Sequence, residues 1–115
     1  MSRLPFYHLI VYVPVTHAQI VRNALAAAGA GRIGHYDSCS FSMRGTGRFR
    51  PQKGAHPAIG KTEKLEEVEE ERIEVVIPAT PKKKVREILA AARKVHPYEE
   101  PAIHLLPMID EQGFL

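Results

Sequence analysis

The sequence predicts one α+β domain of the ferredoxin-like β-α-β-β-α-β type, spanning residues 1–115 with its core at about 6–108. Stretches of alternating apolar residues predict strands, and stretches with apolar residues at helical spacing predict helices. They follow one another as strand-helix-strand and again as strand-helix-strand. A chain of 115 residues with 44% hydrophobic residues is large and apolar enough to bury a core. In such a sandwich both helices cover one face of the sheet.

The first half begins with a strand predicted at 6–15. Both of its faces are largely apolar, which is typical of a central strand, and Ile10 and Tyr12 would lie on the uncovered face. An exposed apolar sheet face predicts self-association. A helix should follow, capped by Thr16 with Gln19 completing a capping box. Its expected buried stripe is Ile20, Val21, Ala24, Leu25 and Ala28, and the glycines at 29 and 31 should end it.

A second strand is predicted at 35–43. Its Cys39, Phe41 and Met43 are expected to face the core, which leaves the alternating serines exposed or at an interface. Residues 45–60 contain four glycines and two prolines and are expected to form a loop. A loop of that length is more often functional than a short one.

The second half starts with an ambiguous segment at 65–77. Its glutamates favour a helix, but Ile73, Val75 and Ile77 alternate as in a strand, so we predict a strand from about residue 68, with an earlier start as a hairpin arm left open. Thr80 as N-cap and Pro81 at the first helical position predict a helix that ends before Pro97. A last strand is expected at 102–108, followed by a tail at 109–115.

Composition excludes several classes of protein. The net charge is +3, but basic residues gather at 44–53 and 82–86, and seven of the thirteen acids lie within 63–74, which is too balanced for a nucleic-acid-binding face. No apolar run approaches the roughly 20 residues that span a bilayer, and no signal peptide is recognised. A single cysteine fits a reducing compartment. We therefore expect a cytoplasmic protein that binds neither nucleic acid nor a membrane.

Two segments carry the candidate binding chemistry. Glycines in 44–51 would let backbone N–H groups approach a ligand, and its arginines offer forked donors for phosphate or carboxylate. A solvated hairpin end is the alternative. In the run 96–101, two prolines fix the backbone around a histidine, a tyrosine and two glutamates. This run can be a rigid connector between helix and strand, a ligand-binding segment, or both. The candidate ligand-binding residues are Ser40, Arg44, Gly45, Gly47, Arg48, His56, His96, Tyr98, Glu99 and Glu100.

Other chemistry stays open as an alternative. Histidines and glutamates from different subunits could form a divalent-metal site, with His96 beside acids and His8 and His104 on neighbouring strands, but no tight ligand spacing indicates one. Cys39 could act as a nucleophile, although a small buried thiol is the simpler interpretation. We assign no catalytic residue, no metal ligand and no cofactor, and an enzyme is the less favoured interpretation.

An ordered series of short motifs resembles the inserted domain of Nif-three-like proteins over about residues 6–108. The motifs are Cys39-Ser40-Phe41-Ser42, Gly45-Thr46-Gly47, Phe49-x-Pro51, Pro57-x-x-Gly60, Lys64-Leu65-Glu66 to Arg72-Ile73-Glu74, and His96-Pro97-Tyr98-Glu99-Glu100. The last of them also resembles the corresponding site of CutA, the divalent-cation tolerance protein.

The resemblance implies a CutA/PII-like ferredoxin fold and a homotrimer. In PII regulators the loop between the second and third strands carries ligand and partner contacts, and residues 44–61 take that place here. Full-length Nif-three-like proteins hold a dinuclear metal site in flanking domains, so the hydrolase activity suggested for them is not implied for these residues. We therefore expect an oligomeric binding or regulatory module for a small anionic ligand or a protein partner, with a CutA-like divalent-metal-binding protein as the alternative.

Overall fold

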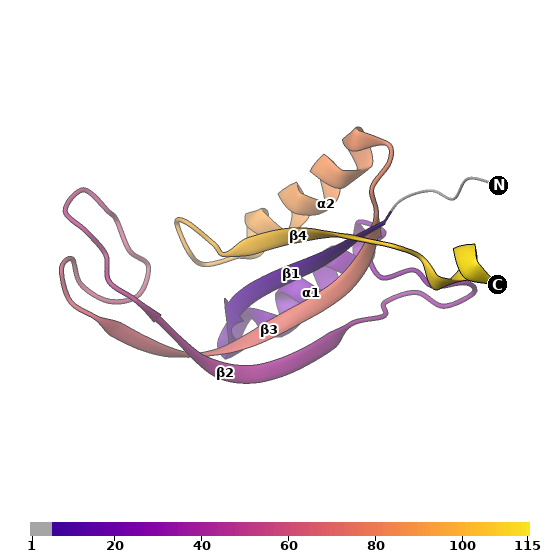
Figure 1. Cartoon of the computed structure of the whole chain (residues 1–115). Helices are drawn as coiled ribbons and strands as arrows, with labels where there is room; N and C mark the ends of the chain where they lie inside the picture. Colours follow the sequence, from indigo (N-terminus) through magenta and orange to yellow (C-terminus); the bar gives the residue numbers. More distant parts are fainter. Residues whose placement is uncertain (1–5) are drawn as a thin grey trace.

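The computed structural model describes residues 6–115, which form one four-stranded antiparallel sheet with two helices on one face (Figure 1). The strand order is β2-β3-β1-β4, which is the predicted ferredoxin-like arrangement. No helix in this described part of the chain is long and apolar enough to cross a membrane. The elements are β1 (Phe6–Pro14), a 3₁₀ turn (Val15–His17), α1 (Ala18–Ala27), β2 (Phe41–Phe49), β3 (Glu66–Pro78), α2 (Lys82–Val95), β4 (Ile103–Met108) and a second 3₁₀ turn (Glu111–Phe114).

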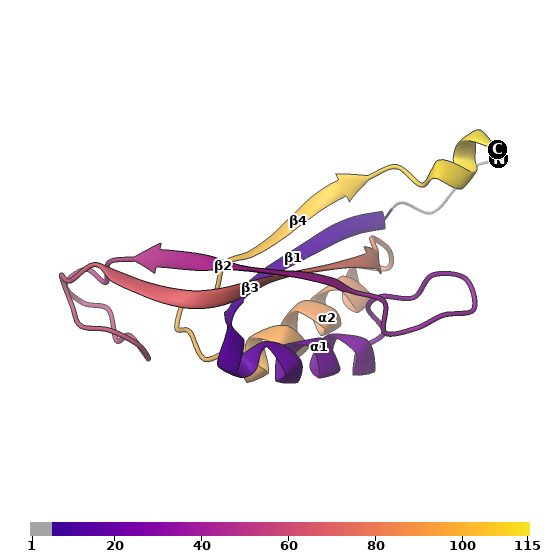
Figure 2. The ribbon, with the colours of Figure 1, turned by 90° about the horizontal axis from the view of Figure 1, so that it is seen from below.

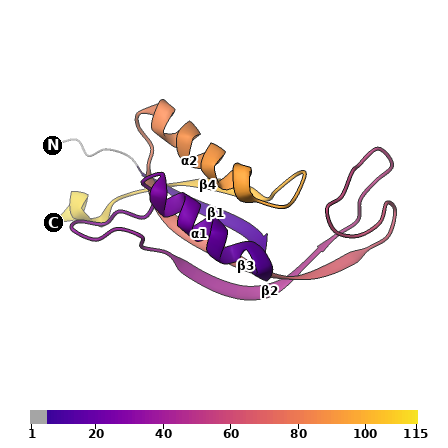
Figure 3. The ribbon, with the colours of Figure 1, turned by 180° about the vertical axis from the view of Figure 1, so that it is seen from behind.

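The core lies between the sheet and the two helices, as Figure 3 shows from the helix side. β1 is central, as predicted: Leu9 stands opposite Val75 of β3 and Leu105 of β4. Since side chains alternate along a strand, every second residue of β1 and β3 points at the helices. The buried cluster consists of Leu9, Val11, Val13, Ala18, Val21, Leu25, Ala30, Ile73, Val75, Ile77, Val85, Ile88 and Ala92.

Within residues 6–115, the other face of the sheet carries no covering layer (Figure 2). We call it the open face; by strand register its side chains are Phe6, His8, Ile10, Tyr12, Phe41, Met43, Glu70, Arg72, Glu74, Val76, His104, Leu106 and Met108. Its rim carries exposed apolar side chains, such as Phe41, which is 61% exposed. Its centre is polar, with His8 Nε2 lying 2.8 Å from Glu74 Oε1 and the Arg72 guanidinium 5.8 Å from the centre of the Tyr12 ring. The predicted uncovered face is therefore present, with apolar and charged residues mixed.

The predicted position of the second strand was wrong. Residues 32–40 form a loop that the Cys39 N–H closes by donating to the Gly31 carbonyl at 2.9 Å, and β2 begins only at Phe41. Gly45 and Gly47 were expected in a loop but pair with β3, so the real loop is 50–65. The predicted orientation of three side chains towards the core was also wrong, because Phe41 and Met43 lie on the open face and Cys39 is half-buried outside the strand.

Both predicted helix starts need correction. Thr16 makes no cap, because a 3₁₀ turn precedes α1 and the Thr16 hydroxyl bonds to His17 instead, so there is no capping box. That turn rotates α1, so that Ala18 is buried and Ile20 is 49% exposed, against the predicted stripe. At α2 the N-cap is Pro81, and the helix starts at Lys82.

The beginning of β1 and the end of β4 are neighbours, since Phe6 pairs with Met108. The β2–β3 hairpin and its loop extend away from the opposite end of the sheet, which gives the molecule its extents of 52 × 24 × 24 Å (Figure 1). The beginning of β1 and the end of β4 therefore lie at one end of the molecule, and the long loop lies at the other.

Candidate functional site

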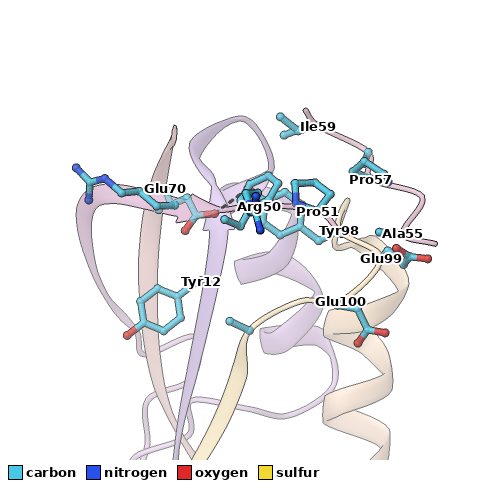
Figure 4. A pocket seen from close by; sticks show the side chains of 15 residues that line it. Tyr12, Arg50, Pro51, Ala55, Pro57, Ile59, Glu70, Tyr98, Glu99 and Glu100 are labelled. Atoms are coloured by element: carbon cyan, nitrogen blue, oxygen red, sulfur yellow. Dashed lines mark hydrogen bonds between the residues drawn. The ribbon is translucent and has the colours of Figure 1, made fainter. Parts of the chain in front are cut away.

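A cavity of about 390 Å³ lies where the loop 50–65 folds back towards the connector 96–102. Its floor is the end of the open face, and the loop and connector form its walls. Figure 4 shows Tyr12 and Glu70 on one side, Ala55, Pro57 and Ile59 on the other, and Tyr98 between the two groups. The lining residues are Tyr12, Gly47, Arg48, Phe49, Arg50, Pro51, Ala55, Pro57, Ala58, Ile59, Glu70, Tyr98, Glu99, Glu100 and Ala102.

The loop that forms one wall is tied to the connector at its middle and closed across its base. The His56 N–H donates to the Glu99 carboxylate at 3.0 Å, which joins the loop to the connector. Nearer the hairpin, the Glu63 N–H donates to the Pro51 carbonyl at 2.5 Å, and the Pro51 side chain is buried. These contacts hold the wall in place against the floor.

His96 fixes the other wall from below. Its ring is only 7% exposed; Nε2–H donates to the Tyr12 carbonyl at 2.7 Å, and Nδ1 accepts from the Tyr98 N–H at 3.1 Å. This pair of bonds requires the neutral ring with its proton on Nε2. Burial favours the same neutral form and lowers the pKa of His96. His96 therefore joins the end of β1 to the connector, and neither nitrogen is left for a ligand.

Tyr98 and Glu70 form the polar end of the cavity. The Tyr98 hydroxyl donates to Glu70 Oε2 at 2.7 Å, and its ring meets Phe49 edge-on at 5.6 Å between centroids. Burial, together with the Glu70 carboxylate, raises the pKa of Tyr98, so the phenol stays protonated and able to donate. Gly47 makes room for this arrangement, because a Cβ there would stand 2.1 Å from Glu70 Oε1.

The structure brings together seven of the ten candidate binding residues. Five of them line the cavity: Gly47, Arg48, Tyr98, Glu99 and Glu100. His56 and His96 hold its walls through the bonds described above. The guanidinium of Arg48 is engaged with Glu67 at 2.9 Å rather than with the polar end of the cavity.

The remaining three candidates lie elsewhere. Ser40 lines a separate cavity of about 120 Å³ beside α1, together with the half-buried Cys39. Arg44 and Gly45 are exposed in the middle of β2 and do not line the larger cavity. The reason is the position of β2: Ser40 precedes the strand, and Arg44 and Gly45 lie along the sheet, whereas the cavity lies at its end.

Sequence reasoning missed much of the floor and the apolar walls. Tyr12 was assigned only to the open face, and Glu70 was hidden within a run of glutamates with no signal of its own. The role of Glu70 can be recognised only once the strand register is known, because the register places Gly47 of β2 close to its carboxylate. Within residues 6–115 no group of three or more His, Cys, Asp or Glu side chains is arranged to hold a metal ion.

Comparisons with known proteins place these features in a family context. No family model matches the chain. It is 50% identical over 105 residues to a GTP cyclohydrolase 1 type 2 homolog of Halalkalibacterium halodurans, covering 91% of this chain and 27% of that protein. A Bacillus subtilis protein of the same description is 46% identical over 104 residues, covering 90% of this chain and 27% of that one. The chain thus spans about a quarter of the length of the curated relatives it matches.

Solved structures show the same similarity to one segment of longer proteins. A Bacillus cereus protein related to NIF3 is 44% identical, with a TM-score of 0.80 over 96% of this chain and 27% of that chain. The chain is homologous to one segment of Nif-three-related proteins. This segment also matches the CutA protein of Archaeoglobus fulgidus, at 17% identity and TM-score 0.66 over 96% of this chain and 91% of that one. A Bacillus subtilis GlnK–ATP complex matches at 11% identity and TM-score 0.61, over 94% and 85%. The last two show the fold alone, and they confirm the predicted CutA/PII-like class.

Proposed function

We propose that this chain is a self-associating binding module, folded as a single domain, that takes a small organic ligand in the cavity between the loop 50–65 and the connector. The cavity itself carries the proposal. Its volume of about 390 Å³ falls within the range of roughly 300–1,000 Å³ that is typical of ligand sites. Apolar walls with a few convergent polar groups, here Tyr98 and Glu70, are also typical of such sites.

The charge of the ligand is a separate question. The expected anionic ligand depended on arginines, but Arg44 lies outside the cavity and Arg48 is paired with Glu67. Arg50 lines the cavity and is exposed. A small anionic ligand or a protein partner therefore remains a prediction from the sequence, and the geometry supports an organic ligand with an apolar body.

Self-association is supported by the open face. Phe41 and Met43 on one edge strand and Leu106 on the other are all more than 45% exposed on it, and exposed apolar side chains gathered on one face are typical of interfaces. A homotrimer is the assembly that the CutA/PII resemblance implies. The cavity floor belongs to the end of this face, so a neighbouring copy would lie close to the site.

A divalent-metal-binding protein is the weaker candidate. Of the histidines named for that alternative, His96 uses both ring nitrogens in hydrogen bonds to the backbone, and His8 Nε2 is engaged with Glu74. The names of the curated relatives refer to proteins more than three times as long, so GTP is a compound to test here rather than an assigned ligand. A cytoplasmic location also remains a prediction.

The test is a thermal-denaturation screen of the full chain against nucleotides, GTP included, and other metabolites, because a ligand that binds the folded state raises its midpoint. Ala58→Trp should abolish the shifts, since Ala58 is exposed and lines the cavity. Ala90→Trp, at an exposed position of α2, should keep them. If no compound shifts the wild type, or if Ala58→Trp binds as well as the wild type, the proposal is wrong.

A further inference from the structure

Two consecutive carboxylates of β3, Glu70 and Glu71, are both only 8% exposed but have very different partners. Because they alternate across the sheet, Glu71 points to the helix face and Glu70 to the open face. Glu71 receives a charge-assisted hydrogen bond from the Arg22 guanidinium of α1, which also donates to Ser42. Glu71 is therefore neutralised within the chain.

Glu70 has no such counter-charge. Among residues 6–115, no lysine, arginine or histidine lies within ion-pairing distance of its carboxylate. Its one hydrogen-bond partner in that range is the Tyr98 hydroxyl, which engages Oε2 alone. A carboxylate that is shielded from most of the solvent and has no cationic partner is stabilised by a cation that binds beside it.

The second oxygen of Glu70 lies at the floor of the cavity. Oε1 stands over Gly47, which lines the same cavity, and it occupies the space that a side chain at 47 would fill. Figure 4 shows the carboxylate projecting towards Tyr98, with the ring of Tyr12 below Glu70 on the same side of the view. A group entering the cavity would therefore meet one free carboxylate oxygen beside aromatic rings.

Glu70 is the one buried charge among the residues that line the cavity. The other charged lining residues, which are Arg48, Arg50, Glu99 and Glu100, are exposed, and Arg48 is paired with Glu67. The buried charge that a group inside the cavity would meet is thus acidic.

From this geometry we propose, building on the binding function proposed above, that the ligand is a small molecule with a flat apolar body and a cationic hydrogen-bond donor, of the amidine or amine class. The donor binds Glu70 Oε1, and the flat body lies between the apolar loop wall and the rings of Phe49 and Tyr98. Charge-assisted hydrogen bonds to a carboxylate are about twice as strong as neutral ones, so Glu70 decides the charge preference of the site.

Benzamidine and benzoate are matched probes, because they share a ring and a planar polar group but carry opposite charge. We expect benzamidine, at millimolar concentration, to raise the thermal midpoint of the full chain and to shift the backbone amide signals of Gly47 and Tyr98 in NMR spectra. Benzoate should do neither. Absence of benzamidine binding, or equal binding of benzoate, would overturn the inference.

Three variants test whether benzamidine binds at the Glu70 carboxylate. Glu70→Gln removes the charge while its carbonyl can still accept from Tyr98, and it should weaken benzamidine binding about tenfold or more. Gly47→Ala should weaken it as well, by displacing Oε1. Gly45→Ala, in the same strand with nothing within 4 Å of the new Cβ, should leave it unchanged.

The same variants separate this inference from the proposed function. A compound from the metabolite screen whose binding is lost in Ala58→Trp but unchanged in Glu70→Gln would leave the binding function standing and overturn the cationic ligand. A change of oligomeric state in Glu70→Gln, with benzamidine binding intact, would mean that a neighbouring copy supplies the donor. That result would equally overturn the assignment of a small molecule.

Discussion

At the scale of single residues, His96 shows how one buried side chain can support a site without touching a ligand. Its two nitrogens bond to the backbone of Tyr12 and Tyr98, the residues whose rings border the cavity. Protonation would place a donor on Nδ1 facing the Tyr98 N–H, which is also a donor. The bond would then be lost, so the connector is anchored only while the ring is neutral.

This dependence makes stability sensitive to pH. Because burial lowers the pKa of His96 below its ordinary value of 6.5, the unfolded chain binds more protons than the folded one as pH falls. The free energy of unfolding should therefore be flat above about pH 7 and decrease from pH 7 to 5.5, as followed by urea denaturation. His96→Gln should cost about 1–3 kcal/mol at pH 7.5 and reduce the slope.

The control for this prediction is His35→Gln, which alters an exposed histidine and should keep the wild-type pH dependence. An unchanged slope in His96→Gln would show that another group controls acid stability.

At the scale of elements, the loop 50–65 depends on a single side-chain acceptor from the connector. Glu99→Ala removes the acceptor of the His56 N–H, so the loop should open more often. Trypsin should then cut at the exposed Lys53 faster than in the wild type. The thermal stability should change by no more than about 0.5 kcal/mol, because Glu99 is exposed. Glu100→Ala is the matched control, and equal cleavage rates in the two variants would contradict this account.

The elements also show which parts of the structure the sequence could predict. β1 and α2 were found because their burial follows a local period, as at Leu9, Val11 and Ile88. β2 was misplaced because its glycines indicate a loop locally. Gly47 is explained only by the Glu70 carboxylate of the neighbouring strand, which is a tertiary cause. The connector's part in the site was predicted, but the floor was not, because register decides which glutamate faces the cavity.

At the scale of the whole molecule, the open face predicts how copies associate. Phe41→Glu places a charge at an apolar rim position and should reduce the oligomeric mass measured by light scattering after size exclusion. Ile20→Glu, at a comparably exposed apolar position of α1 on the helix side, should leave the mass unchanged. A monomeric wild type, or dissociation caused by Ile20→Glu alone, would contradict an interface on the open face.

The pairing of Phe6 with Met108 has a consequence for the evolution of such segments. A unit whose first and last strands start and finish side by side can be spliced into a surface turn of another protein without pulling that turn apart. The closure entropy that the host chain experiences is then that of a short connection, whatever the size of the insert. Gene rearrangements could therefore move this fold between hosts as a cassette, with its long loop and cavity displayed at the far end, away from the splice points.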